Sequence, residues 1–176
     1  PNSEVLYNML GIAKRALCQH LESVDCFKKA IEIKSDFSEA YNGLGNVLRE
    51  MGKPEAAIDS FQKALDIKEN YPEAYYNMSI VLHEIGSLKD AVKNFKTAIE
   101  RKKDYHEAYN GLGNTLKEMG DLEAAFEAFK EAIKIKHDFA EAHFNLGNLL
   151  HEKGQFESAI KSYKQAIKYK ENFQQA

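Results

Sequence analysis

Apolar side chains along this 176-residue chain recur at intervals of three and four residues, a spacing that places them on one face of an α-helix. In the segment 38–71, Tyr41, Leu44 and Leu48 share one such face. A second stripe follows after a short gap and consists of Ala57, Phe61, Ala64 and Leu65. The pattern predicts two amphipathic helices joined by a tight turn.

The same pair of helices recurs every 34 residues. Residues 39–52 have the sequence EAYNGLGNVLREMG, and residues 107–120 have the sequence EAYNGLGNTLKEMG. This period is typical of a helix–turn–helix solenoid, in which each hairpin buries its apolar face against its neighbours. Five repeats, here called repeats 1 to 5, fit without a gap: 4–37, 38–71, 72–105, 106–139 and 140–173. The first and second helix of each repeat are called helix A and helix B.

Turn residues punctuate each repeat. A glycine stands at the predicted end of helix A, where a left-handed backbone commonly closes a helix: Gly52, Gly86, Gly120 and Gly154. Cys18 takes this place in repeat 1, so the turn there is less well defined by the sequence. Each repeat closes with Asp or Asn before an aromatic residue, which predicts a turn into the next helix A. The five pairs are Asp36-Phe37, Asn70-Tyr71, Asp104-Tyr105, Asp138-Phe139 and Asn172-Phe173.

Small residues also recur in the middle of helix A, where glycine costs about 1 kcal/mol relative to alanine. They are Gly11, Gly45, Ser79, Gly113 and Gly147. The repetition of this cost predicts that a neighbouring helix passes too close for a larger side chain. The facing position in helix B is small as well: Ser23, Ala57, Ala91, Ala125 and Ala159.

These positions resemble the tetratricopeptide repeat family over essentially the whole chain. The matching residues in repeat 2 are Tyr41, Leu44, Gly45, Leu48, Ala57, Phe61 and Ala64. The resemblance implies an all-α fold, a right-handed superhelical solenoid of five tandem 34-residue helix-turn-helix repeats, with helix A lining a concave groove. We expect residues 1–176 to form a single array. We also expect a fragment of a longer array, because Gln174-Gln175-Ala176 would begin a sixth repeat.

Helix A would present three columns of residues to this groove. The first column is Asn8, Asn42, Tyr76, Asn110 and Phe144; the second is Met9, Gly43, Asn77, Gly111 and Asn145; the third is Ile12, Asn46, Ile80, Asn114 and Asn148. An Asn amide both donates and accepts, so it can pair with an extended peptide backbone. Asn is also a mediocre helix former, so helix stability does not explain these columns. We expect the asparagines, Tyr76 and Phe144 to contact a peptide; the alternative is a solvated helix surface.

Two charged columns lie near the end of helix A. The basic column is Arg15, Arg49, His83, Lys117 and His151, and the acidic column is Glu50, Glu84, Glu118 and Glu152. Basic residues there suit the helix dipole, whereas acidic ones are mildly unfavourable. We expect Arg49, His83, Lys117 and His151 to belong to the binding surface. The acidic column either contacts a partner or pairs with neighbouring basic residues, and the sequence leaves both open.

The composition of the chain argues against several classes of partner and of chemistry. Lys and Arg total 24 against 27 Asp and Glu, a net charge of −3 that predicts neither nucleic acid nor an anionic membrane as partner. No apolar run approaches the roughly 20 residues that span a bilayer. Cys18 and Cys26 lack a metal-like spacing, so we expect reduced thiols and an intracellular, cytoplasmic location. The histidines form no ligand set, and we predict no metal site, no cofactor and no catalytic residue in this chain.

Three functional hypotheses follow. The first is a protein–protein interaction scaffold that binds an extended peptide or partner segment in the groove. The Asn-lined groove also resembles the repeats of O-GlcNAc transferase-type arrays, which implies a second hypothesis. In it, the repeats recruit substrates for a larger enzyme whose catalytic domain lies elsewhere in the full-length protein. The third is a structural array that self-associates through exposed terminal repeats.

Overall fold

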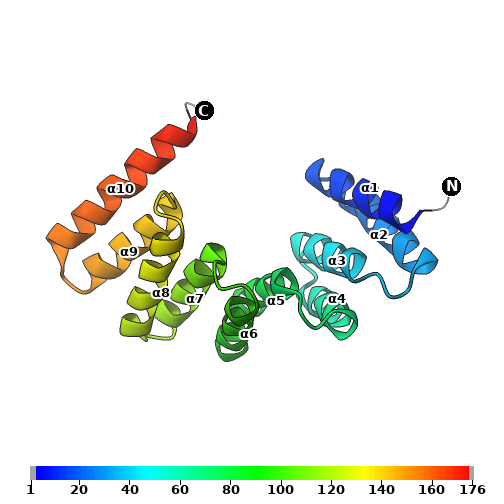
Figure 1. Cartoon of the computed structure of the whole chain (residues 1–176), viewed down its shortest axis with the longest axis horizontal. Helices are drawn as coiled ribbons and strands as arrows, with labels where there is room; N and C mark the ends of the chain where they lie inside the picture. Colours follow the sequence, from blue (N-terminus) through cyan, green and yellow to red (C-terminus); the bar gives the residue numbers. More distant parts are fainter. Residues whose placement is uncertain (1–2, 175–176) are drawn as a thin grey trace. The chain divides into compact units, whose positions relative to one another are not determined.

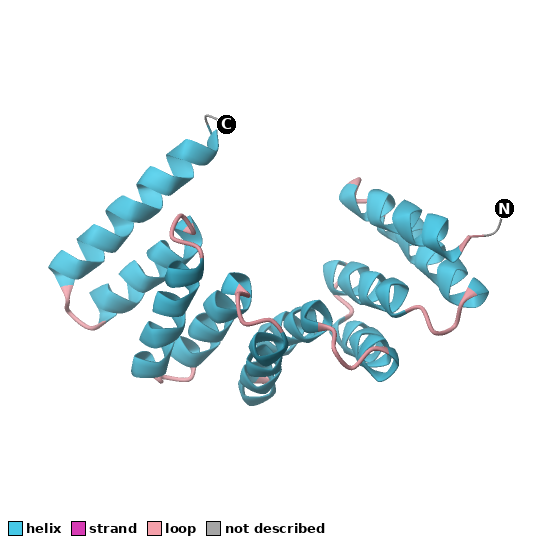
Figure 2. Ribbon diagram, viewed as in Figure 1, coloured by secondary structure: helices cyan, strands magenta, loops and turns pink. Residues whose placement is uncertain are grey.

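The computed structural model describes residues 3–174, with side chains described as far as Lys170. This part of the chain contains ten helices and no strand, as Figure 1 and Figure 2 show. The A helices are α1 (Glu4–Ala16), α3 (Ser38–Glu50), α5 (Pro72–Glu84), α7 (His106–Glu118) and α9 (Ala140–Glu152). The B helices are α2 (His20–Ile33), α4 (Pro54–Ile67), α6 (Leu88–Arg101), α8 (Leu122–Ile135) and α10 (Phe156–Gln174). The predicted all-α succession of helix pairs is confirmed.

The helices belong to two compact units. The N-terminal unit ends at Ser87 and holds α1 to α5, and the C-terminal unit begins at Leu88 and holds α6 to α10. In each unit every helix packs on the next one along the chain. A helices also contact each other, α1 with α3, α3 with α5 and α7 with α9, whereas B helices within a described unit make no such contact. The A helices therefore lie on the inner side of each unit, and the B helices splay apart on the outer side.

An aromatic ring from helix B lies at the centre of each hairpin core. Phe61 and Phe129 are completely buried. A Cβ atom at Gly45 would stand 2.5 Å from the Phe61 ring, and one at Gly113 would stand 2.5 Å from the Phe129 ring. The close approach predicted at these glycines is therefore confirmed, and the atoms that require it belong to an aromatic ring of the same repeat.

The ring of Phe27 also joins one repeat to the next. It lies between Gly11 of α1, where a Cβ would come within 2.8 Å of the ring, and Gly43 of α3, where a Cβ would overlap the ring. Gly111 is approached in the same way by Phe95, at 2.6 Å. Gly43 and Gly111 were expected in a groove column, and that expectation is wrong: both are packing positions beneath the ring of the preceding helix B.

The turns after helix A are alike in all repeats. The glycines at these turns have positive φ: Gly52 (+69°), Gly86 (+77°), Gly120 (+83°) and Gly154 (+72°). Cys18 has the same left-handed conformation, with φ of +57°. Its amide donates to the Arg15 carbonyl at 2.9 Å, and the Gln19 amide donates to the Lys14 carbonyl at 2.9 Å. The turn that the sequence left poorly defined is thus the same turn, made without glycine.

The last helix differs from the prediction. The turn expected at Asn172-Phe173 is absent, because α10 continues to Gln174. At inner junctions the corresponding aromatic is covered by the following A helix, as at Tyr71 and Tyr105, which are 9% and 7% exposed. No described helix follows α10, so local helix propensity decides and the helix runs on. Residues 175–176, expected to continue a sixth repeat, lie outside the described residues.

The left-handed Cys18 gives a stability prediction. This conformation costs a residue with a side chain about 1–2 kcal/mol, while glycine loses about 0.5–1 kcal/mol more backbone entropy on folding. We expect Cys18→Gly to raise the free energy of unfolding by up to about 1 kcal/mol, measured by urea denaturation followed by circular dichroism. Gly52→Ala is the matched control and should lower it by a similar amount. A lower midpoint for Cys18→Gly would contradict the left-handed turn in repeat 1.

Candidate functional site

Asparagines on the inner side form hydrogen-bonded pairs between consecutive A helices. In the N-terminal unit, Nδ2 of Asn77 on α5 donates to Oδ1 of Asn42 on α3 at 3.0 Å. In the C-terminal unit, Nδ2 of Asn145 on α9 donates to Oδ1 of Asn110 on α7 at 3.0 Å. The two pairs occupy equivalent places, two repeats apart in the sequence. Sequence reasoning placed these residues on one face but missed the pairs.

The first member of each pair is held from a second side. Asn110 is only 4% exposed, and its Nδ2 donates to Oε1 of Glu141 at 2.9 Å. Its amide nitrogen and carbonyl oxygen are therefore both engaged within the fold. Asn110 was predicted to contact a partner; in the structure it is buried and bonded to Glu141 and Asn145.

Asn42 occupies the corresponding place beside a buried phenol. Burial, and then the charges of Glu39 and Glu73, raise the pKa of Tyr71 to about 12, while the neighbouring Asn42 amide acts in the opposite direction. The phenol therefore stays protonated at neutral pH, next to the amide that receives the Asn77 hydrogen bond. Asn42 is half-buried and, like Asn110, holds the Asn of the next A helix.

The remaining groove asparagines differ in their surroundings. Asn46 and Asn114 are half-buried and make no side-chain hydrogen bond within residues 3–174. Asn148 accepts a hydrogen bond from the Tyr163 hydroxyl at 2.9 Å. The buried Oδ1 of Asn8 has no partner, because Gly43 stands where a later repeat carries the donor. These four side chains all lie on the inner side, as expected, but only two keep a whole amide available.

The aromatic and histidine members of the columns are spread over both units. Tyr76 and His83 are half-buried on α5 of the N-terminal unit. Phe144 on α9 is 51% exposed, and its ring centroid lies 6.0 Å from that of Tyr163. His151 is exposed and meets the Phe156 ring edge-on at 5.4 Å. Phe144 therefore offers the larger apolar surface among these residues.

The basic and acidic columns pair with each other. Arg15 contacts Glu50 at 3.6 Å, Arg49 contacts Glu84 at 3.2 Å, and Lys117 contacts Glu152 at 3.4 Å. In each pair the basic residue belongs to one repeat and the Glu to the next. The structure thus favours the pairing interpretation of the acidic column. Arg49 and Lys117, expected to contact a partner, already have a carboxylate partner in the fold.

The described residues were also searched for other kinds of site. Between residues 3 and 174, no group of three or more His, Cys, Asp or Glu side chains is arranged to hold a metal ion. None of the helices in this range combines the length and apolar character that crossing a membrane requires.

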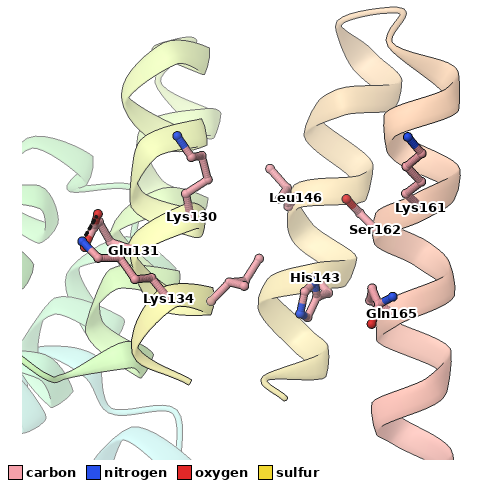
Figure 3. A pocket seen from close by; sticks show the side chains of 9 residues that line it. Lys130, Glu131, Lys134, His143, Leu146, Lys161, Ser162 and Gln165 are labelled. Atoms are coloured by element: carbon pink, nitrogen blue, oxygen red, sulfur yellow. Dashed lines mark hydrogen bonds and ion pairs between the residues drawn. The ribbon is translucent and has the colours of Figure 1, made fainter. Parts of the chain in front are cut away.

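A cavity of about 430 Å³ lies between α8, α9 and α10 of the C-terminal unit (Figure 3). It is lined by Lys130, Glu131, Ile133, Lys134, His143, Leu146, Lys161, Ser162 and Gln165. Sequence reasoning missed this cavity. One signal was present: His143 interrupts a column that is otherwise tyrosine, namely Tyr7, Tyr41, Tyr75 and Tyr109.

Comparison with known families agrees with this architecture. Family models described as TPR repeat match residues 45–86, 81–120 and 113–154. Models described as tetratricopeptide repeat match residues 5–37, 26–59 and 140–173. The chain belongs to the tetratricopeptide repeat family. No curated protein sequence matches it.

Solved structures of tetratricopeptide repeat proteins have the same fold. A crystal structure of MamA is 27% identical, with a TM-score of 0.82 over 94% of this chain and 97% of that chain. YrrB, described as a TPR protein with an unusual peptide-binding site, is 24% identical, with a TM-score of 0.73 over 96% and 87%. PilF of Pseudomonas aeruginosa is 19% identical, with a TM-score of 0.88 over 94% and 76%. As a tetratricopeptide repeat protein, the chain is a protein-interaction scaffold.

The two classes of asparagine should differ in their effect on stability. Asn110→Ala removes a buried side chain and leaves Asn145 and Glu141 without a partner, so we expect the free energy of unfolding to fall by about 1–3 kcal/mol. Asn114→Ala removes no hydrogen bond and introduces a better helix former, so its effect should stay within about 0.5 kcal/mol. Urea denaturation measures both. Equal losses would contradict the distinction between positioning and available amides.

Proposed function

We propose that the inner surface of the A helices binds an extended peptide segment of a partner protein through the peptide backbone. The observation that carries this proposal is the state of Asn77 and Asn145. Each uses one N–H to bond the neighbouring A helix and retains its Oδ1 and its second N–H. An extended peptide offers the complementary pair, one N–H and one C=O per residue.

Orientation supports this role. The bond to Asn42 or Asn110 fixes the amide of Asn77 or Asn145 before any ligand arrives, so less side-chain entropy is lost on binding. Asn46 on α3 and Asn114 on α7 add a second available amide in each unit. Each unit thus contains its own small set of backbone-binding groups, built in the same way.

A solved structure of the same fold supports this role, because YrrB is described as a TPR protein with an unusual peptide-binding site. The Asn-lined surface also suits the narrower hypothesis, a substrate-recruiting region of a larger enzyme such as an O-GlcNAc-type glycosyltransferase. Both hypotheses use the same contacts and differ in what the repeats are attached to.

A peptide selected on the protein itself provides the test. We expect a peptide from a phage-displayed random library to bind the wild-type chain. The combined variant Asn46→Ala, Asn77→Ala, Asn114→Ala and Asn145→Ala should weaken its binding at least about tenfold, because each lost hydrogen bond contributes about 1 kcal/mol. N-methylation of the peptide backbone should weaken binding similarly, since it removes the N–H donors. Isothermal titration calorimetry measures both.

Gln62→Ala on the outer helix α4 is the control and should bind the peptide like the wild type. Unchanged affinity of the combined Asn variant, with an unchanged circular dichroism spectrum, would exclude the inner surface as the contact.

Self-association is a second candidate, favoured by apolar faces at both ends of the chain. On α1, Leu6 and Met9 are 59% and 61% exposed, and on α10 Ile167 is 56% exposed. Leu65 and Ile99, at the same repeat position as Ile167, are only 6% and 8% exposed. Between two repeats, this face of helix B is covered by helix A of the next repeat. In a dimer, α1 of a second copy could cover the face around Ile167 in the same way.

Sedimentation velocity from micromolar to millimolar concentration tests this candidate. We expect the mean mass of the wild type to rise with concentration, and Ile167→Asp to abolish the rise because a carboxylate would be buried in the contact. Ile67→Asp places the same charge at an exposed position of α4 and should leave the rise unchanged. A monomer at every concentration would exclude the candidate.

A further inference from the structure

We propose that the cavity between α8, α9 and α10 binds an acidic peptide segment of a partner protein, with an apolar side chain in the cavity and its carboxylates on the surrounding lysines. Most of the residues that line it belong to the B helices α8 and α10, not to the inner surface of the A helices (Figure 3). The inference therefore goes beyond the inner-surface function proposed above and does not depend on it.

The cavity exists where the tyrosine column is interrupted. Tyr41 and Tyr75, at the same position in repeats 2 and 3, pack against the buried core of the N-terminal unit. His143 has a shorter ring, and its Nε2 lies 2.9 Å from the carbonyl oxygen of His137. The imidazole also lies 5.4 Å from the ring of Tyr169, tilted by 34°. These contacts hold it toward the start of α9, where it forms part of the cavity wall.

Apolar surface that is buried elsewhere lines this cavity. Ile133 is half-buried, whereas Leu65 and Ile99 at the same repeat position are 6% and 8% exposed. Leu146 is likewise half-buried, whereas Leu112 at the same position is 7% exposed. Ile31 and Leu44, at these positions between repeats 1 and 2, are half-buried as well. An apolar side chain placed in the cavity would give Ile133 and Leu146 the burial that Ile99 and Leu112 have.

The charge around the cavity favours an acidic ligand. Three lysines and one glutamate line it, and in Figure 3 the charged ends of Glu131 and Lys134 meet on the side of α8 that points away from α9. Lys134 pairs with Glu131 at 3.0 Å and Lys130 pairs with Glu127 at 3.2 Å. Both are exposed contacts within α8 that a ligand carboxylate could replace at little cost. Lys161 makes no ion pair within the described chain. A segment with carboxylates on either side of an apolar residue complements this arrangement.

The N-terminal unit contains a counterpart with the opposite character. At the positions of Lys134 and Lys161, repeats 1 and 2 carry Glu32 and Asp59, and Tyr41 stands in place of His143. The same fold therefore accommodates acidic residues and a tyrosine at these positions. The residues of repeats 1 and 2 therefore suggest variants that should remove the proposed site and still fit the repeat fold.

A labelled peptide tests the proposal. The probe is a fluorescein-labelled peptide with a central phenylalanine flanked by glutamates, and fluorescence anisotropy measures its binding to the full chain. We expect saturable binding that weakens as salt is raised, since exposed charges are screened. Replacing the probe's phenylalanine by alanine should weaken binding at least about tenfold, because a buried aromatic side chain is lost.

Variants locate the contact. The double variant Lys134→Glu and Lys161→Asp should lower the affinity at least about tenfold, because two attractive charges become repulsive. The matched control, Lys28→Glu and Lys63→Asp, changes the net charge equally on the outer side of the N-terminal unit and should bind like the wild type. In the variant His143→Tyr, the phenylalanine probe and its alanine version should bind with nearly equal affinity, because the new tyrosine ring fills the cavity.

Three results would overturn the proposal. The first is no binding of the probe at millimolar protein, and the second is equal loss in the double variant and its matched control. The third is loss of binding in Asn77→Ala and Asn145→Ala with no loss in the lysine variant, which would place the probe on the inner surface. Failure of the inner-surface function would instead appear as unchanged binding of the phage-selected peptide by the Asn variants.

Discussion

The burial of an aromatic ring from helix B against a helix A without a side chain is the contact on which the rest of the structure depends. Phe61 lies on Gly45, Phe129 lies on Gly113, and Phe27 reaches a glycine in the next repeat as well as one in its own. The glycine costs each helix about 1 kcal/mol, but full burial of a large apolar side chain contributes about 1.5–3 kcal/mol. The close approach also draws consecutive A helices together, which brings Asn77 within 3.0 Å of Asn42.

The same geometry gives each unit two unlike surfaces. Because the A helices touch, their polar side chains can bond each other across the junction, and the inner surface is organised by amide pairs and ion pairs. The B helices do not contact each other within a unit, and a cavity lies between α8, α9 and α10. Tyr41 and Tyr75 pack against the core of the N-terminal unit, whereas His143, at the same repeat position, lines this cavity.

Most of the fold could be predicted from the sequence because its determinants are local and repeated. Glycine with positive φ ends helix A, and proline begins α4 and α5, so the helix boundaries follow from single residues. The end of α10 could not be predicted in this way. The Asx–aromatic pair makes a turn where a following helix covers the aromatic, and that condition is tertiary rather than local.

The candidate site was only partly predictable, for a related reason. Periodicity tells which residues share a face, but it does not tell whether two side chains on neighbouring helices are within bonding distance. Asn110 and Asn114 have the same residue type and nearly the same position, yet one is buried between two partners and the other keeps its amide. The sequence did contain a signal for the cavity. A histidine, His143, stands in a column of tyrosines, and lysines occupy the repeat positions around it.

The charge distribution separates the two modes of recognition. On the inner side, Arg49 with Glu84 and Lys117 with Glu152 cancel each other, so little net charge is left there to select a partner. A surface of that kind discriminates through hydrogen-bond geometry, which suits a ligand recognised by its backbone. The cavity between α8, α9 and α10 has apolar surface and one lysine, Lys161, without an ion pair in the described chain, so a ligand there would be selected by its side chains. With both proposed surfaces, the scaffold would hold one partner by its backbone and select another by its sequence.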